Sequence, residues 1–353
     1  MIVDPNFEVP TELGKEDIQF FNVLEGPFEI SGVYYEDGRF RRMPEAVAKT
    51  VSPGVTRLHC HTAGGRIRFR TDSPYIAVSV QLCNVHQSLF SSVGTAGFDL
   101  YLEEQGRLLK SFIPTWYLCD HYAYAIDCPG RKMQDYIINM PLYAGVESLH
   151  IGLAEGSQVL PPKPFKSDKK VVFYGSSITQ GGCASRPGTS YEAMLSRRFG
   201  FDYVNLGMSG NARAEDTMIE YIAGLSMDIF VYDYDHNAKT VEYLQDTHEK
   251  MFRAIRKSHP DIPILMMSRP KYYVNEATQK RMDVIRTTYE NAKAQGDEKV
   301  WMLTGPELMA LCGEDGLVDG THPNDFGFAS MAKAVGDLFQ REGFFEKDGG
   351  IEA

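Results

Sequence analysis

The second half of the sequence repeats one unit, in which an apolar run of strand length is followed by a longer amphipathic segment. The apolar runs contain few polar residues, which is typical of strands buried on both faces of a parallel sheet. They read "VVFYG", "YVNLG", "MDIFVYDY", "IPILMMS" and "VWMLTG". Helices are expected between and after them, around 190–198, 215–223, 241–257 and 326–341. Repeated strand–helix units therefore predict an α/β/α domain with a parallel sheet over 168–345.

The first half has a different rhythm, because short segments alternate apolar and polar residues between turn signals. Examples are "FEISGVYY", "GRIRFRT", "YIAVSVQL", "GFDLYLEE", "DYIINMPL" and "SLHIGLAEG". Such alternation indicates strands with one buried face, and many of them indicate a β-sandwich, here jelly-roll-like. The proline-rich, basic stretch "QVLPPKPFKSDKK" over 158–170 is typical of a linker. A chain of 353 residues fits two domains, and the N-terminal one is expected at 10–160.

Charge and hydropathy argue against two classes of partner. The formal net charge is −11 and no basic cluster stands out, whereas nucleic acids are bound by clustered lysine and arginine. No window approaches the ~18 consecutive apolar residues of a membrane span. We therefore expect neither nucleic acid nor a membrane as a partner.

The N-terminus and the cysteines bear on the compartment. "MIVDPNFEVPTELGKED" lacks a basic segment followed by an apolar one, so the sequence predicts a cytoplasmic protein. A signal peptide removed ahead of this sequence would instead make the protein periplasmic or secreted. The six cysteines are scattered without C-x-x-C spacing, which fits reduced thiols better than a disulfide framework or a zinc site.

Polar residues follow the strands of the second half at positions where chemistry is expected. "GSSITQGG" (175–182), "NLGMSGNA" (205–212) and "YDYDHNA" (232–238) come at the ends of the first three strands. In parallel sheets the ligand site lies at the carboxyl ends of the strands. Near the C-terminus, "LVDGTHPNDFG" places Asp319 three residues before His322. A hydroxyl, a histidine, an acid and amide donors are the groups that acyl transfer needs.

A serine attacks an ester only with a neighbouring base, because its hydroxyl titrates far above neutral pH. Of the nine histidines, His322 is the best candidate for that base. The carboxylate of Asp319, three residues earlier, can accept a hydrogen bond from Nδ1 and fix the tautomer of the ring.

These blocks carry a specific resemblance to a known family. "GSSIT" followed by glycines, "NLGMSGNA" and "DGTHPN" are similar to the signature blocks of the SGNH (GDSL-type) hydrolases. The resemblance implies a flavodoxin-like α/β/α fold, Ser177 as the nucleophile, and Asp319 and His322 as the acid and the base. "GFDLY" in the first half resembles the β-rich domain that precedes some SGNH esterases, including two-domain carbohydrate esterases.

The same resemblance implies an oxyanion hole. Its donors are the backbone amides of Ser177 and Gly210 and the side-chain carboxamide of Asn237. Two positions depart from the family pattern. Ser176 replaces the usual aspartate before the nucleophile, and the third block reads "DHNA" where G-x-N-D is expected.

Each of these residues, taken alone, has a structural alternative. A serine in a strand–helix turn, such as Ser177, is usually a helix cap, and Asp319 can cap the last helix. Gly210 and Asn237 are common turn residues. "GSSITQGG" can also be an anion-binding loop, although it lacks the lysine of a P-loop. The ordered set in four separate loops favours the hydrolase interpretation.

Other chemistry-bearing residues are weaker candidates. His59 and His61 share one face of an expected strand, as metal ligands do, but no third ligand is evident. The acids and the histidine of "YDYDHN" also suggest a metal, yet beside Asn237 we interpret them as residues that shape the pocket. Cys183 has no histidine of its own, so a nucleophilic role is not expected.

The expected activity is that of a serine esterase that hydrolyses small O-acyl esters through an acyl-serine intermediate, and the favoured substrates are acetyl esters of carbohydrates. No metal or organic cofactor is expected, and the partner is a small-molecule or oligosaccharide ester. The substrate class rests on the resemblance alone. Two alternatives stay open: a thioesterase or lysophospholipase of the same family, and a non-catalytic carbohydrate-binding protein with a degenerate site. The sequence is compatible with a homo-oligomer.

Overall fold

The structure, a computed structural model, describes residues 13–86, 90–114 and 120–345. The chain packs as two compact units that interleave in the sequence. The first unit contains residues up to Arg42, Cys60–Pro164 and Ser185–Gly188, and the second contains Met43–His59, Phe165–Ala184 and the chain from Thr189. The predicted ranges 10–160 and 168–345 are continuous and do not describe this exchange of short segments. As domain boundaries they stay a prediction.

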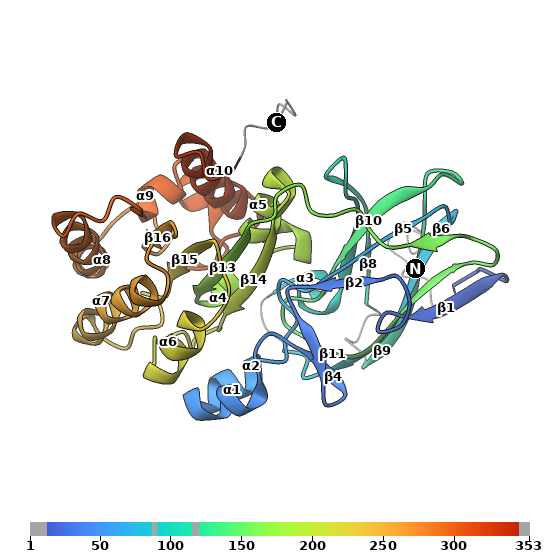
Figure 1. Cartoon of the computed structure of the whole chain (residues 1–353), viewed down its shortest axis with the longest axis horizontal. Coiled ribbons are helices and arrows are strands. Elements are labelled where there is room, and N and C mark those ends of the chain that lie inside the picture. The colour runs from blue at the N-terminus through green and yellow to red at the C-terminus, as the bar shows by residue number, and fades with distance from the viewer. Residues whose placement is uncertain (1–12, 87–89, 115–119, 346–353) are drawn as a thin grey trace, which may run out of the picture. The chain divides into compact units, whose positions relative to one another are not determined.

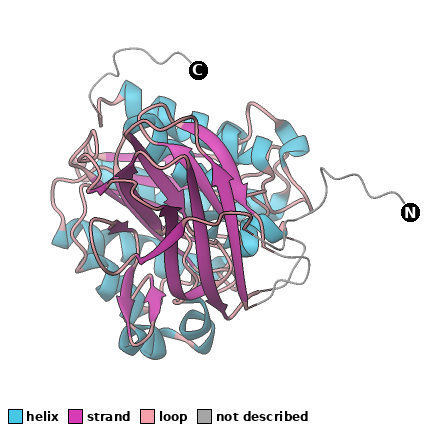
Figure 2. Cartoon of the chain, turned by 90° about the vertical axis from the view of Figure 1, so that its right-hand side faces the viewer, coloured by secondary structure: helices cyan, strands magenta, loops and turns pink. Residues whose placement is uncertain are grey.

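Two antiparallel sheets form the first unit, and Figure 2 shows their long strands in magenta. One sheet has the order β1–β11–β6–β9, with bounds Ile18–Asn22, Gly145–Ala154, Tyr75–Cys83 and His121–Asp127. The other has the order β12–β5–β10–β7–β8 with β2 paired to β5, and bounds Val159–Leu160, Arg66–Thr71, Gln134–Asn139, Phe98–Leu102, Arg107–Phe112 and Glu29–Ser31. The hairpin β3–β4 (Tyr34–Glu36, Arg39–Arg41) and the short helix α3 (Ser92–Ala96) also belong to this unit.

Alternation of apolar and polar residues explains why these segments are strands. In β6, Val78 and Val80 are at most 1% exposed, whereas Ser79 and Gln81 are partly exposed. Apolar residues of β5, β7 and β10 in the other sheet enter the same hydrophobic core. The predicted antiparallel β-rich domain is confirmed.

The "GFDLY" segment includes strand β7 and has a structural role in the first unit. Asp99 is fully buried, and its Oδ1 accepts a 2.7 Å hydrogen bond from Asn139 Nδ2. Its Oδ2 accepts from the Gly188 amide at 2.7 Å and from Arg186 Nη1 at 3.2 Å. Arg186 also donates to the hydroxyl of Tyr101. Because a buried carboxylate is stable only when it is paired or hydrogen-bonded, this motif fixes the short exchanged segment in the first unit.

A five-stranded parallel sheet forms the centre of the second unit, in the order β14–β13–β15–β16–β17. The strands are Asp202–Gly207, Lys170–Gly175, Ile229–Asp233, Ile264–Met267 and Val300–Leu303 in that order. In chain order this arrangement is 2-1-3-4-5, which is flavodoxin-like and places ligand sites beside the first strand, at the point where the order reverses. The predicted α/β/α class is confirmed.

Helices cover both faces of the parallel sheet (Figure 1). Helix α5 (Tyr191–Phe199) packs with α10 (Asp325–Arg341) on one face, and α6 (Asp216–Ala223), α7 (Val241–Ser258) and α8 (Glu276–Ala294) follow one another on the other. The bounds of α5, α6, α7 and α10 agree closely with those expected from the sequence, which gave no bounds for α8. Among the described helices, none is both long and apolar enough to cross a membrane.

Two helices from the first half of the sequence pack in the second unit. They are α1 (Glu45–Val51), which contacts α6, and α2 (Pro53–Leu58). Ala48 and Val55 are fully buried in the core that the sheet shares with α6, α7 and α8. The start of α2 is marked by a serine cap, because the Val55 amide donates to Ser52 Oγ at 3.2 Å and a proline takes the first helical position. The strand-rich interpretation of the first half missed both helices.

Candidate active site

The turn after β13 presents two serines in different ways. Ser176 is the N-cap of the short helix α4 (Ser177–Gln180), and its hydroxyl accepts a 3.2 Å hydrogen bond from the Ile178 amide. Ser176 is fully buried, whereas Ser177 is 9% exposed. Gly175 permits the turn, since a Cβ at this position would lie 1.6 Å from a carboxylate oxygen of β15. The structure therefore uses Ser176 as the helix cap and leaves Ser177 partly accessible.

Ser177, His322 and Asp319 form one hydrogen-bonded chain, so the structure brings together the three residues that the sequence singled out. Ser177 Oγ lies 2.8 Å from His322 Nε2, and His322 Nδ1 lies 2.8 Å from Asp319 Oδ2. An ionised carboxylate only accepts hydrogen bonds, so Nδ1 carries the proton and Nε2 is the acceptor for the serine hydroxyl. In this tautomer the imidazole can take the serine proton.

Backbone hydrogen bonds hold Asp319 and His322 in this geometry. Asp319 Oδ1 accepts from the amides of Thr321 at 3.0 Å and His322 at 2.8 Å, and the His322 carbonyl accepts from the Val318 amide at 2.8 Å. Burial acts to raise the pKa of Asp319, but these hydrogen bonds and the nearby His322 ring lower that pKa to about 2. The carboxylate is therefore ionised throughout the neutral range. Asn324, and not Asp319, is the N-cap of α10.

Two of the three residues expected to form the oxyanion hole, Gly210 and Asn237, lie on loops that are hydrogen-bonded to each other. Gly210 has a φ of +70°, a left-handed conformation that glycine adopts without strain. The adjacent Ser209 amide donates to Gln180 Oε1 at 3.1 Å, which ties this loop to α4. Asn237 Oδ1 accepts from the Ala212 amide at 3.1 Å, and Nδ2 has no hydrogen-bond partner within the described part of the chain. The carboxamide is thus oriented by its oxygen, and its N–H groups are available as donors.

A buried acid lies next to the serine turn. Asp233, the last residue of β15, is 2% exposed, and its carboxylate accepts hydrogen bonds from Thr179 Oγ1 and from the Ser176 amide. Burial, reinforced by the charge of Asp235, raises the pKa of Asp233 to about 8 against the effect of those two hydrogen bonds. The side chain is therefore mostly protonated at neutral pH. The sequence predicted a pocket-shaping residue here but not a neutral acid.

Two arginines hold the loop that contains the unusual third block. Arg269 Nε donates to Asp235 Oδ2 at 3.2 Å, and Arg281 Nη1 donates to the Asp235 carbonyl at 2.6 Å. Burial lowers the pKa of the neighbouring His236 to about 4, so its ring is neutral at neutral pH. Neither arginine was predicted from the sequence as part of the site. Arg269 comes two residues after the end of β16, and following the polar residues after every strand would have found it.

The remaining candidates have structural explanations. His59 is the C-cap of α2 rather than part of a strand, and His59 and His61 each hydrogen-bond to a backbone carbonyl. No group of three potential metal ligands occurs among residues 13–86, 90–114 and 120–345. Burial, with the charge of Asp319, raises the pKa of Cys183 to about 12, so this side chain remains a thiol, which is a poor nucleophile.

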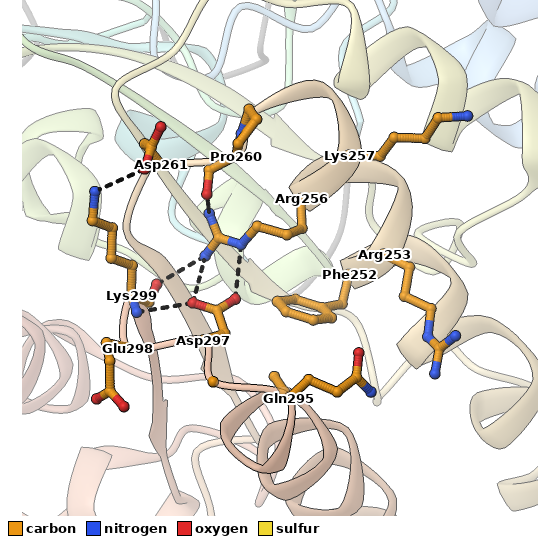
Figure 3. Close-up of a pocket in the computed structure, with 12 residues that line it drawn as sticks. Phe252, Arg253, Arg256, Lys257, Pro260, Asp261, Gln295, Asp297, Glu298 and Lys299 are labelled. Atoms are coloured by element: carbon orange, nitrogen blue, oxygen red, sulfur yellow. Dashed lines mark hydrogen bonds and ion pairs between the residues drawn. The ribbon is translucent and has the colours of Figure 1, made fainter.

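A pocket of about 590 Å³ lies at the end of the parallel strands away from the serine site, where β16 and β17 begin (Figure 3). Arg256 lies at its centre and forms an ion pair with Asp297, with Nε 2.8 Å from Oδ2. The guanidinium also donates to the backbone carbonyls of His259, Pro260, Ile262 and Lys299. Because its donors are used within the protein, this pocket is a charged structural junction and contains none of the residues of the serine site.

Two family models match the sequence. The GDSL-like Lipase/Acylhydrolase family matches residues 168–340, and the N-terminus of the SGNH-hydrolase esterase type (GxDLY) matches residues 18–159. With the parallel sheet and the serine site, these matches define a serine hydrolase. The chain belongs to the SGNH (GDSL-type) hydrolase family, in the form that carries a β-rich N-terminal domain. A search of curated proteins found no match to the sequence.

Solved structures share the fold over nearly the whole chain. A protein described as a GDSL-like lipase from Bacteroides ovatus is 28% identical, with a TM-score of 0.83 over 94% of this chain and 100% of its own. The salicylyl-acyltransferase SsfX3 of a tetracycline biosynthetic pathway is 19% identical, with a TM-score of 0.77 over 93% and 98%. An acetyl xylan esterase from Butyrivibrio proteoclasticus is 12% identical, with a TM-score of 0.61 over 94% and 100%. The last two show a common fold only.

Proposed function

We propose that this protein is a serine esterase that removes small acyl groups, mainly acetyl groups, from carbohydrate esters. The observation that carries the proposal is the hydrogen-bonded chain from Ser177 Oγ through His322 to Asp319, with 2.8 Å at both links. Ser177 is the nucleophile, His322 the general base and acid, and Asp319 the residue that orients and stabilises the imidazolium. The acetyl and carbohydrate parts are supported by the esterase-type N-terminal domain and by the shared fold of the acetyl xylan esterase.

In the acylation step, His322 Nε2 takes the proton of Ser177 while Oγ attacks the carbonyl carbon of the ester. The carbonyl oxygen becomes an oxyanion, which the amides of Ser177 and Gly210 and the Nδ2 group of Asn237 stabilise. When the tetrahedral intermediate collapses, the bond to the alcohol breaks. The alcohol leaves with the proton that His322 held, and the acyl group stays on Ser177.

In the deacylation step, His322 takes a proton from water, and the hydroxide attacks the acyl carbon. The second tetrahedral intermediate breaks the bond to Ser177 Oγ, which recovers its proton from His322. The products are a carboxylic acid and the free enzyme. If an alcohol takes the place of water, the same site transfers the acyl group instead, so added acceptors distinguish hydrolysis from transfer.

The test uses the purified full chain and its Ser177→Ala variant. Acid release is measured from p-nitrophenyl esters of increasing acyl length and from acetylated xylo-oligosaccharides, with and without an added alcohol acceptor. We expect the acetyl esters to react fastest, acetate to appear from the oligosaccharides, and the variant to be inactive. Fastest turnover of long acyl esters would favour a lipase or thioesterase. A folded protein that hydrolyses none of these esters would contradict the proposal.

A further inference from the structure

The segment that follows β16 contacts both halves of the proposed site. We name residues 268–273, "SRPKYY", the brace segment. Its first residue, Ser268, is 1% exposed, and its hydroxyl accepts a 2.8 Å hydrogen bond from the Gly305 amide at the start of α9 (Gly305–Leu308). The segment is therefore fixed at the end of one buried strand and the beginning of the helix that follows the next.

Arg269 connects the brace segment to the oxyanion loop. Its Nε donates to Asp235 Oδ2 at 3.2 Å, and its Nη2 lies 3.4 Å from the Asp235 carbonyl. The Asp235 side chain is 1% exposed and that of Arg269 is 19% exposed, so the carboxylate of this ion pair is shielded from water. Asp235 stands two residues before Asn237, whose carboxamide is held in turn by the Ala212 amide. The guanidinium thus fixes the backbone from which the proposed donor projects.

Lys271 connects the brace segment to the acid–base loop. Its Nζ donates to the Gly320 carbonyl at 3.0 Å and to Glu314 Oε2 at 2.8 Å. The other oxygen of Glu314 accepts from the amides of Tyr272 at 3.0 Å and Tyr273 at 3.1 Å. Gly320 directly follows Asp319, so the ammonium group holds the turn that places the acid and the histidine.

We propose that the brace segment positions the two catalytic loops together, with Arg269 holding the loop of Asn237 and Lys271 holding the loop of Asp319 and His322. The inference rests on the proposed function. Neither side chain contacts the reacting atoms, so both are positioning residues. Misplacement of a catalytic group by about 1 Å can lower the rate by about 10²-fold, which sets the size of the effect to look for.

The first arm of the test compares Arg269→Gln and Arg269→Lys with the control Arg253→Gln. Arg253 forms a pair with Glu249 on α7, and its side chain is 64% exposed. For Arg269→Gln we expect kcat on p-nitrophenyl acetate to fall by about 10- to 10²-fold with little change in KM, because Asn237 acts in the transition state. Arg269→Lys should recover part of kcat, since lysine can reach the carboxylate without the forked geometry. The control should match the wild type.

The second arm compares Lys271→Met with the control Lys280→Met. Lys280 pairs with Glu276 at the start of α8 and its side chain is 60% exposed. We expect Lys271→Met to slow the reaction of Ser177 with a fluorophosphonate and to increase amide hydrogen exchange over 317–322. Arg269→Gln should increase exchange over 234–238 instead. The two variants should therefore loosen different loops.

Hydrogen exchange separates the failure of this inference from the failure of the proposed function. The proposed role of the brace segment would be contradicted if Arg269→Gln showed wild-type amide hydrogen exchange over 234–238. An unchanged kcat per folded molecule in this variant would contradict it as well. If the wild-type protein hydrolyses no ester, the proposed function fails, and the exchange data still decide whether the segment holds the two loops. Should Arg269→Gln not fold, Arg269→Lys and the Asp235→Asn variant take its place, since both weaken the same ion pair.

Discussion

Charged groups are buried at both ends of the parallel strands, but their roles differ. We call the side of the sheet where the strands begin the amino edge, and the side where they end the carboxyl edge. At the amino edge, Arg256 directs its donors to Asp297 and to four backbone carbonyls, and the network closes on itself. At the carboxyl edge, the network runs from Asp319 through His322 and ends at the hydroxyl of Ser177, which is 9% exposed. The hollow at the amino edge has the volume of a ligand pocket, yet the reactive chain lies at the other edge.

The direction of the chain explains this difference. In a parallel α/β sheet the helices begin at the carboxyl edge and end at the amino edge, so the first edge receives the positive ends of helix dipoles and the second receives the negative ends. Arg256 and Lys257 lie in the last turn of α7, where a cation is stabilised. Ser177 is the first residue of α4, and the N-terminal end of a helix carries partial positive charge, which stabilises an anion. One edge therefore favours structural cations and the other favours oxyanion chemistry.

The largest expected effect is at the histidine of the carboxyl edge. Removal of the base by His322→Ala should lower kcat by about 10⁴-fold or more, because the serine hydroxyl then has no proton acceptor. Asp319→Asn should lose a similar or smaller factor, since it disturbs the tautomer and the imidazolium. Initial rates on p-nitrophenyl acetate give both values. Activity within tenfold of the wild type in His322→Ala would remove this residue from the mechanism.

The next largest effect is expected at Asn237, in the third block, which departs from the family pattern. Asn237→Ala should lower kcat by about 10²- to 10³-fold and leave KM nearly unchanged, because the carboxamide binds the oxyanion rather than the ground-state ester. His236 is the rival donor from the same loop, and His236→Ala is the matched variant. Its ring is partly buried and neutral at neutral pH, and we expect a smaller loss. If Asn237→Ala kept the wild-type kcat and His236→Ala lost most of it, His236 and not Asn237 would be the side-chain donor to the oxyanion.

At the amino edge the expected effect is on stability and not on activity. Arg256→Gln leaves Asp297 without its cationic partner, and both side chains are only 17% exposed. The free energy of unfolding should fall by about 2 to 4 kcal/mol, near the value for a broken buried pair after allowance for partial exposure. Urea unfolding measures this loss, and kcat per folded molecule should match the wild type. A loss of kcat with unchanged stability would mean that the amino edge takes part in the reaction.

The last of these predictions is a pH dependence of stability at the buried acid of the carboxyl edge. The pKa of Asp233 rises from 3.8 to about 8 on folding, so the folded state binds this proton more tightly than the unfolded state. The resulting stabilisation is complete below about pH 4 and is lost as the pH rises through about 8. Asp233→Asn stays neutral at every pH.

The stability of the wild type relative to Asp233→Asn should therefore decrease as the pH is raised from about 4 to about 8. Urea unfolding of both proteins at a series of pH values gives this difference. A difference that stays constant or grows with pH would show that the carboxyl group is ionised in the folded protein.

Much of the fold could be predicted from the sequence, because both patterns are local. The helices and strands of the second unit follow from their periodicity, and β6, β7 and β10 follow from alternation. Strands such as β8, "RLLKSF", were missed because their alternation is broken and their neighbours define them. Helices α1 and α2 were missed for a related reason: their apolar faces match a core formed by residues far along the chain.

The candidate site divides in the same way. Ser177, Asp319 and His322 were predicted because short sequence blocks carry them, and Asn237 because the family resemblance places the third block there. The positioning roles of Arg269 and Lys271 were not predictable, since their partners lie 34 and 43 residues away in the sequence. The protonated state of Asp233 was not predictable either, because it depends on complete burial by other elements.

The central claim, that Ser177 is the nucleophile at the carboxyl edge, is tested most directly by covalent labelling. The wild-type protein, Ser176→Ala and Ser177→Ala are treated with a fluorophosphonate, and the modified peptide is identified by mass spectrometry. Since Ser176 caps α4 and Ser177 contacts His322, the label should appear on Ser177 in the wild type and in Ser176→Ala, and should be absent from folded Ser177→Ala. Labelling that persists in Ser177→Ala and disappears in Ser176→Ala would contradict the account.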